Sequence, residues 1–316
     1  MSDIFRNPWP HDQHGFREVL RWKLGLGPKE ENAYPDATSA APWRAIDPAD
    51  LQTIPSTGWR VHWLGHASFL LCGAGMRILI DPIFSDFCAP FPFHFSRLKR
   101  HVPPPLSLSD LPVIDVILLT HHHYDHCDLP TLRHFPRNTT IIVAEGHRAW
   151  LEGKGFTNVR ELPWWENFRM GEVDITSTPA QHFTARSLLD RNHAHWCGWS
   201  IEGGGKRLWH AGDSGYCEVF REIGERLGPF DLSMIPIGAY APRWFMQPMH
   251  MNPQEAVQVF QDTQTKQAIA MHWGTFTLTD EPLGEPPLLL EKALLDAGID
   301  NDRFAAGAVG QCWCVD

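Results

Sequence analysis

Short apolar runs recur along this chain from about residue 59 to its C-terminus. Several alternate apolar and polar positions, as in Val173-Asp174-Ile175-Thr176, and others are continuously apolar, as in Val116–Leu119. Runs of this length, rich in Val, Ile and aromatic residues, are typical of β-strands. The pattern therefore predicts strands at Trp59–Leu64, Phe69–Cys72, Arg77–Asp81, Val113–Leu119, Thr140–Ala144, Val173–Thr178, Cys197–Ile201, Arg207–Ala211, Leu232–Ile235, Gln267–Met271 and Gln311–Val315.

Helical patterns fall between these strands, at about Gly146–Gly153, Pro253–Asp262 and Pro287–Ala297. The second begins with proline, which is tolerated in the first turn because its missing N–H would have no partner there. Strands that alternate with helices predict a layered α/β fold. Residues 1–57 are rich in Pro, Ala and charge and predict an irregular arm with one short helix near Gly15–Leu24. We expect residues 58–316 to form one domain.

Composition limits the classes of binding partner and the cellular compartment that we expect for this chain. A formal net charge of −10 argues against a nucleic-acid-binding surface and offers no general attraction to anionic membranes. Seven dispersed cysteines without a CxxC pair disfavour a disulfide framework and favour a reducing compartment. The chain shows no signal-peptide core and no run of membrane-spanning length. These features predict a cytoplasmic protein, with peripheral contact at the inner membrane face left open.

One segment carries most of the chemistry. Thr120–Asp128 reads THHHYDHCD and follows the apolar run that ends at Leu119. The loop leaving a strand end would turn its metal-binding groups toward one point, and these are His121, His123, Asp125 and His126. Imidazoles with a carboxylate suit zinc or another first-row divalent ion better than magnesium or calcium. The alternative is a histidine-rich surface loop.

Three further candidates follow downstream, each just after a strand-like run. They are His182, Asp213 and His272, and Asp213 lies between Gly212 and Ser214-Gly215. Glycine beside Asp213 would let the backbone approach a metal closely. Each residue alone would more often be structural. In this order after the HxHxDH motif, they predict the further ligands that a pair of metals would need.

This order of motifs resembles the metallo-β-lactamase superfamily, which implies an αβ/βα four-layer sandwich in a single domain. The resemblance assigns residues 58–316 to a hydrolase domain of that type and implies two metal sites joined by one carboxylate. A histidine at position 123, where oxygen-reducing di-iron members carry an acid, favours the hydrolytic, zinc-type branch. The first Zn²⁺ would be held by His121, His123 and His182, the second by Asp125, His126 and His272, and Asp213 would bridge them.

Other stretches are similar to the family of phospholipases D that hydrolyse N-acyl-phosphatidylethanolamine. The most particular are Ile235–Tyr240, Pro242–Met246 and His272–Phe276, within a match from about Trp59 to Leu295 and a weaker echo at Asn7–Pro10. The family has Gln-His where this chain reads Met249-His250. The resemblance implies that a hydroxide bridging two metals cleaves the lipid into N-acylethanolamine and phosphatidic acid. A same-fold hydrolase of a lactone or another phosphodiester remains the alternative.

The same resemblance implies roles for residues around the metals. His250 would face the substrate phosphate or the leaving group, and Asp125 would also orient the nucleophile. Asp81 would brace the ligand loop without binding metal. His66 would do the same or shape a structural turn, whereas His122 points away from the ligands. The expected partner is a phospholipid or another small molecule, and a homodimer stays open. A non-catalytic binding protein would be marked by a lost ligand, and none is missing.

Aromatic residues cluster in the loop 84–100, followed by cations. Apolar rings beside cations suit an interface with lipid acyl chains and phosphate head groups, or equally a buried loop with a solvated basic end. The arm carries further apolar residues, for which packing on the core is the commoner outcome. The loop residues are Phe84, Phe87, Phe91, Phe93, Phe95, Arg97, Lys99 and Arg100, and those of the arm are Phe5, Trp9, Phe16, Val19, Leu20 and Trp22.

Overall fold

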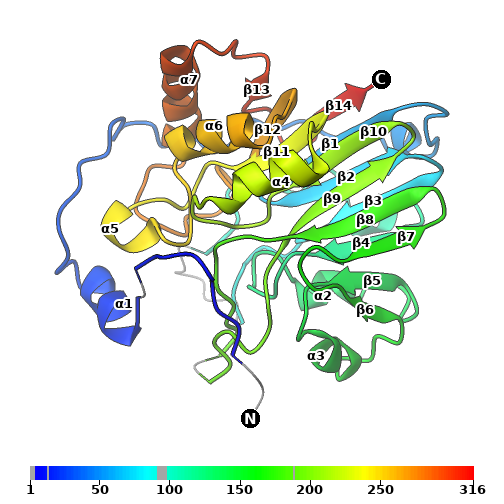
Figure 1. Ribbon diagram of the computed structural model, residues 1–316, viewed down its shortest axis with the longest axis horizontal. Coiled ribbons are helices and arrows are strands. Elements are labelled where there is room, and N and C mark those ends of the chain that lie inside the picture. The colour runs from blue at the N-terminus through cyan, green and yellow to red at the C-terminus, as the bar shows by residue number, and fades with distance from the viewer. Residues whose placement is uncertain (1–3, 13, 91–97, 188) are drawn as a thin grey trace.

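Two β-sheets packed face to face form the body of the molecule in the computed structural model, which describes the chain except residues 1–3, 13, 91–97 and 188 (Figure 1). The first sheet consists of β1 Trp59–Gly65, β2 Ser68–Gly73, β3 Met76–Ile80, β4 Val116–Leu119, β5 Thr140–Val143, β6 Val159–Glu161 and β14 Cys312–Val315, in the order β14-β1-β2-β3-β4-β5-β6. The second consists of β7 Asn167–Met170, β8 Val173–Thr178, β9 Gly198–Gly203, β10 Lys206–His210, β11 Leu232–Pro236, β12 Gln267–Met271 and β13 Phe304–Ala305, in the order β13-β12-β11-β10-β9-β8-β7.

Helices lie outside the two sheets, and some of them cover the outer face of each sheet. They are α1 Phe16–Lys23, α2 Leu129–Leu132, α3 Arg148–Glu152, α4 Val219–Leu227, α5 Arg243–Met246, α6 Pro253–Asp262 and α7 Glu285–Ala297. Leu132 of α2 and Leu151 of α3 pack on outward-facing residues of the first sheet, whereas α6 packs on β11 and against α4 and α7. The predicted four-layer αβ/βα sandwich is confirmed (Figure 1). Within the described part of the chain, every helix is too short or too polar to cross a bilayer.

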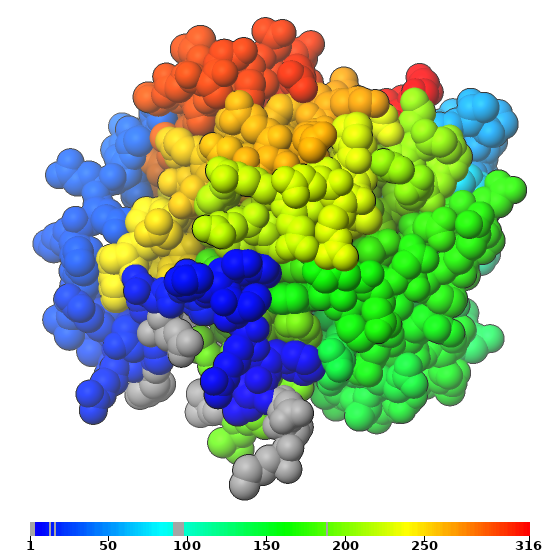
Figure 2. All heavy atoms as spheres, viewed as in Figure 1, coloured from blue at the N-terminus to red at the C-terminus, as the bar shows by residue number. Residues whose placement is uncertain are grey.

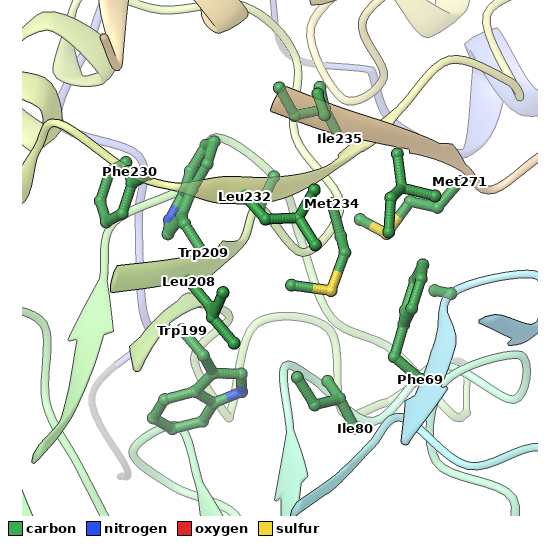
Figure 3. Packing of buried hydrophobic residues seen from close by; sticks show 14 of the residues in the cluster. Phe69, Ile80, Trp199, Leu208, Trp209, Phe230, Leu232, Met234, Ile235 and Met271 are labelled. Atoms are coloured by element: carbon green, nitrogen blue, oxygen red, sulfur yellow. The ribbon is translucent and has the colours of Figure 1, made fainter. Parts of the chain in front are cut away.

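The core explains why the central strands read as continuous apolar runs. In β4, Val116 and Leu118 face the second sheet, whereas Ile117 and Leu119 face the helices on the outside. A strand covered on both faces needs apolar residues at every position. Figure 3 shows Phe69 and Ile80 of the first sheet facing the side chains of the second.

All the predicted strands are present, and their ends lie within three residues of the predicted bounds. The predicted helices are also found, and α6 has the predicted bounds. The prediction missed β6, β7 and β13 and the helices α2, α4 and α5. The missed strands are short, and β6 and β7 are at most half-buried, so they lack a strong apolar pattern.

Candidate metal centre

The carboxyl ends of strands from both sheets meet at one edge of the sandwich. In the first sheet β3 and β4 run parallel, and in the second β10, β11 and β12 run parallel. Strand β8 shares the direction of β10, because each is antiparallel to β9. The segments after β4, β8, β10 and β12 carry the predicted ligands, and their donor atoms form groups within 4.8 Å.

Asp81, directly after β3, fastens the loop that follows β4. Its carboxylate accepts hydrogen bonds from the Thr120 backbone N–H (2.8 Å) and hydroxyl (2.6 Å), and from Nδ1 of His126 (2.8 Å). Because a carboxylate occupies the Nδ1 side of the ring, Nε2 of His126 is the nitrogen left for a metal. The Arg186 guanidinium fixes the same loop from the other side by donating to the carbonyls of His122 and Cys127.

The first ligand group consists of three histidines. Nε2 of His121 lies 2.9 Å from Nδ1 of His123, and Nε2 of His182 lies 3.2 Å from that same atom. The remaining nitrogens of two rings are engaged, because Nδ1 of His182 donates to the Met249 carbonyl (2.9 Å) and Nδ1 of His121 lies 2.9 Å from the Thr120 hydroxyl. These contacts leave three nitrogens converging on one point.

The second group joins Asp125, His126 and His272, with His66 beside them. Oδ2 of Asp125 lies 3.5 Å from Nε2 of His126 and 3.4 Å from Nε2 of His272. Nε2 of His66 lies 2.9 Å from the same oxygen and is therefore placed to hold the carboxylate in position. His66 occupies the turn between β1 and β2 in the left-handed region, with φ 53°.

Asp213 lies between the two groups. Its Oδ2 is 3.1 Å from Nε2 of His126, 3.1 Å from Nε2 of His272 and 3.8 Å from Nε2 of His182. Its Oδ1 is buried and has no hydrogen-bond partner within the part of the chain that the structure describes. Gly212 is required before it, since φ is 64° and a Cβ there would come within 2.3 Å of the Cys197 carbonyl oxygen. The position suits a carboxylate shared by two cations.

The spacing of these donors fits metal ions. Donors around a tetrahedral zinc with bonds of about 2.0–2.1 Å lie about 3.3–3.4 Å apart. The donor distances of 2.9–3.2 Å in the first group and 3.1–3.5 Å in the second are close to this value. Two small cations therefore fit with only slight movement of the side chains.

Burial keeps the three histidines of the first group neutral. It lowers the pKa of His123 to about 4 and of His182 to about 3, and holds that of His121 well below its usual range. These rings are neutral at pH 7, the form that binds metal. Burial alone would raise the pKa of Asp125 and Asp213, but the neighbouring histidines, His126 first, hold both well below the usual range. Both carboxylates therefore stay ionised.

His250 lies on a different loop, and one of its ring nitrogens lies within 4.8 Å of donor atoms of His182 and Asp213. Its ring centroid is 5.0 Å from that of His182 and 5.5 Å from that of His272. The backbone is fixed, because its N–H donates to the Met246 carbonyl and its own carbonyl accepts from Arg243. Nδ1 is buried without a partner among the described residues. Burial lowers the pKa of the ring to about 3, so it is neutral at pH 7.

A cavity of about 330 Å³ opens onto these groups. His123, Asp125, Asp213 and His250 contribute its polar surface, and Arg191, which is exposed, contributes a cation. The apolar walls come from the arm helix α1 (Val19, Trp22), from α5 and the loop after it (Phe245, Met246, Met249), and from the segments that follow β8 (Phe183) and β12 (Leu278). The cavity can thus place a polar group at the ligands and an apolar group beside them.

The remaining sequence predictions have mixed outcomes. His122 faces His147 at a centroid distance of 4.8 Å, away from the ligands as predicted. In the loop 84–100, Arg100 is buried and donates to backbone carbonyls, so the expectation of a solvated cation was wrong there. In the arm, Trp9 packs against Trp164, and Phe5 stacks on a histidine ring. Phe91, Phe93, Phe95 and Arg97 lie outside the described residues, as does the side chain of Phe16.

Sequence reasoning missed the groups that hold the candidate ligands through contacts between residues far apart in the sequence. The Met249 carbonyl, the Arg186 guanidinium and the Asn7 amide each contact a ligand residue or its loop. The echo at Asn7–Pro10 was a signal for the arm, but no spacing rule links it to residue 182. The walls supplied by Val19 and Trp22 were also missed, because they depend on how the arm folds back.

The chain is similar to known proteins over most of its length. A family model described as the beta-lactamase superfamily domain matches residues 76–273. N-acyl-phosphatidylethanolamine-hydrolyzing phospholipase D 1 of Caenorhabditis elegans is 36% identical over 98% of this chain and 92% of the relative. The mitochondrial N-acyl-phosphatidylethanolamine-hydrolyzing phospholipase D of Saccharomyces cerevisiae is 36% identical over 80% of this chain, and the match spans 55% of the yeast protein.

Among solved structures, an isothiocyanate hydrolase from Delia radicum gut bacteria superposes with a TM-score of 0.67 over 81% of this chain and 100% of that one. The two sequences are 23% identical. At this level the likeness concerns the fold, which hosts different chemistries in different proteins.

Proposed function

Because this chain belongs to the β-lactamase superfamily, we propose that it is a binuclear phosphodiesterase of the phospholipase D type that hydrolyses N-acyl-phosphatidylethanolamine-like lipids. The enzyme class, a metal-dependent hydrolase, follows from relatives that match most of the chain. The products would be N-acylethanolamine and phosphatidic acid. The two resident ions would be Zn²⁺, with another first-row divalent ion as the alternative.

One observation carries this proposal: two ligand groups, joined by Asp213, lie at an otherwise largely apolar cavity. His121, His123 and His182 would hold one ion, and Asp125, His126 and His272 the other. The adjoining apolar walls, which include Trp22 and Phe245, suit an acyl or glyceryl chain. A small polar substrate would gain little from such walls.

Bound ions would supply a hydroxide nucleophile at neutral pH, by lowering the pKa of water from about 15.7 to about 7, and would neutralise phosphate charge. The chain's own residues would do the rest. Asp125, held by His66, would orient the nucleophile. His250 would contact the phosphate or the departing oxygen, while Asp81 keeps the ligand loop in place. The apolar walls would exclude water from the acyl chain.

One observation supports a second substrate class on the same scaffold. The side chain of Met249 lines the cavity where the related family carries a glutamine. An apolar group at this position removes a hydrogen-bonding partner for a lipid head group. A lactone, or a phosphodiester with a different head group, would lose less from this change.

We also propose peripheral contact with a lipid surface through α1. Leu20, Leu24 and Leu26 are 47%, 60% and 66% exposed, and the cations Arg17 and Arg21 lie on the same segment. The helix also walls the cavity through Val19 and Trp22. Exposed leucines beside cations suit the boundary between acyl chains and phosphates. Co-sedimentation with phospholipid vesicles should therefore fall when Leu20 and Leu24 are replaced by serine.

Elemental analysis combined with a substrate panel tests the proposed function. We expect two zinc ions per chain and turnover of N-acyl-phosphatidylethanolamine above that of nitrophenyl phosphodiesters and lactones. One ion or fewer in carefully prepared, active protein would refute the binuclear site. Preferential turnover of a lactone would refute the phosphodiesterase assignment while leaving the metal site intact.

A further inference from the structure

The N-terminal arm reaches the first ligand group through one side chain, that of Asn7. Its amide nitrogen Nδ2 donates to the carbonyl of His182 (2.9 Å), and the N–H of His182 donates to its Oδ1 (3.2 Å). The two residues are 175 positions apart in the chain. A side-chain amide that pairs with both backbone groups of one residue acts as a neighbouring strand would, and fixes that residue in position and in rotation.

The segment that carries Asn7 is itself anchored. The N–H of Phe5 donates to the Asn192 carbonyl (2.9 Å), and its ring stacks on His195 at 4.5 Å between centroids. Figure 2 shows the N-terminal segment (dark blue) lying across residues from the middle of the chain. Because Pro8 follows Asn7, the backbone of Asn7 is restricted to extended conformations. The backbone that carries the Asn7 amide is therefore fixed independently of the contact with His182.

The contacts of Asn7 complement those of the imidazole. Nδ1 of His182 donates to the Met249 carbonyl (2.9 Å), which sets the rotation of the ring and leaves Nε2 for the metal. Asn7 instead sets where the backbone of His182 lies. Nε2 of His182 is 3.2 Å from Nδ1 of His123, so a small backbone shift would change this donor distance directly.

We propose that Asn7 is a positioning residue for the ligand His182, so that the arm is part of the first metal site. This inference rests on the proposed metal-dependent function. Loss of a partner that holds a ligand typically weakens metal binding by about 10- to 100-fold. Here the loss should fall on one of the two ions, because among the described residues the side chain of Asn7 bonds His182 and His11 and no member of the second group, such as Asp125 or His272.

The test compares Asn7→Ala with Asn158→Ala, an asparagine whose amide also bonds a backbone carbonyl and a hydroxyl, far from the ligands. Both variants and the wild type are loaded with zinc and titrated with a chelator, and ions per chain are counted. We expect Asn7→Ala to release one ion about 10- to 100-fold more readily, with the other ion retained. Asn158→Ala should follow the wild type. Circular dichroism establishes that the variants fold alike.

A double variant tests which site Asn7 supports. The His123→Ala variant has already lost a ligand of the first site. Adding Asn7→Ala to it should therefore not change how tightly the ion of the second group is retained. Wild-type retention of both ions in Asn7→Ala would overturn the inference, and so would equal weakening of both. A wild type that binds two ions but hydrolyses no lipid would instead overturn the proposed substrate, and the metal readout for Asn7 would still stand.

Discussion

Replacing His250 by alanine separates catalysis from metal binding. The ring lies 5.0 Å from His182 and 5.5 Å from His272 between centroids and lines the cavity, while its backbone is held by bonds to Met246 and Arg243 that alanine would keep. The substitution should therefore remove the side chain alone. A positioned acid–base group contributes about 10²–10⁴-fold to turnover. This corresponds to about 2.7–5.4 kcal/mol of activation free energy.

The assay measures steady-state turnover of N-acyl-phosphatidylethanolamine together with zinc per chain. We expect His250→Ala to lose about 10²–10⁴-fold in kcat and to keep the wild-type metal content. His123→Ala, the matched change inside a ligand group, should lose metal and activity together. His101→Ala, which removes a ring bonded to the Thr277 hydroxyl, should change neither. Full activity in His250→Ala would make the residue structural, and loss of metal would make it a ligand.

Three further changes have defined outcomes. Asp81→Asn should weaken metal binding by about 10- to 100-fold in a chelator titration, because the amide has no charge and only one acceptor oxygen, whereas Thr120 and Nδ1 of His126 now bond both carboxylate oxygens; unchanged affinity would contradict this. Trp22→Ala should raise KM for long-chain lipids more than for short-chain ones, and equal effects would argue against an acyl site at this wall. Phe230→Ala should cost about 3–5 kcal/mol of unfolding free energy in urea, whereas Val113→Ala, 81% exposed, should change it little.

The sequence predicts most of the fold because local patterns are strong where burial is complete. Strand β4 is apolar at every position from Val116 to Leu119, and both of its faces are covered. Helix α4 was missed although Val219, Phe220 and Ile223 recur at helical spacing. Strand β13, with only Phe304–Ala305, has too few residues for any period.

The candidate ligands could be found from sequence because each follows a strand whose direction brings it to one edge. His121 and His272 come from different sheets, yet both stand just past a strand end. The supporting contacts could not be found this way. Asn7 meets His182 across 175 positions, and Trp22 reaches the cavity only because the arm folds back over it. Such contacts depend on tertiary packing, which leaves no local pattern.

Hydrolysis in water enriched in oxygen-18 tests the central claim most directly. If the nucleophile attacks phosphorus, mass spectrometry should find the label in phosphatidic acid and none in the N-acylethanolamine. Phospholipase D chemistry at this metal centre predicts that distribution. Label in a released fatty acid would mean attack at an acyl carbon, and label in the ethanolamide hydroxyl would mean cleavage of the carbon–oxygen bond; either result would contradict the account.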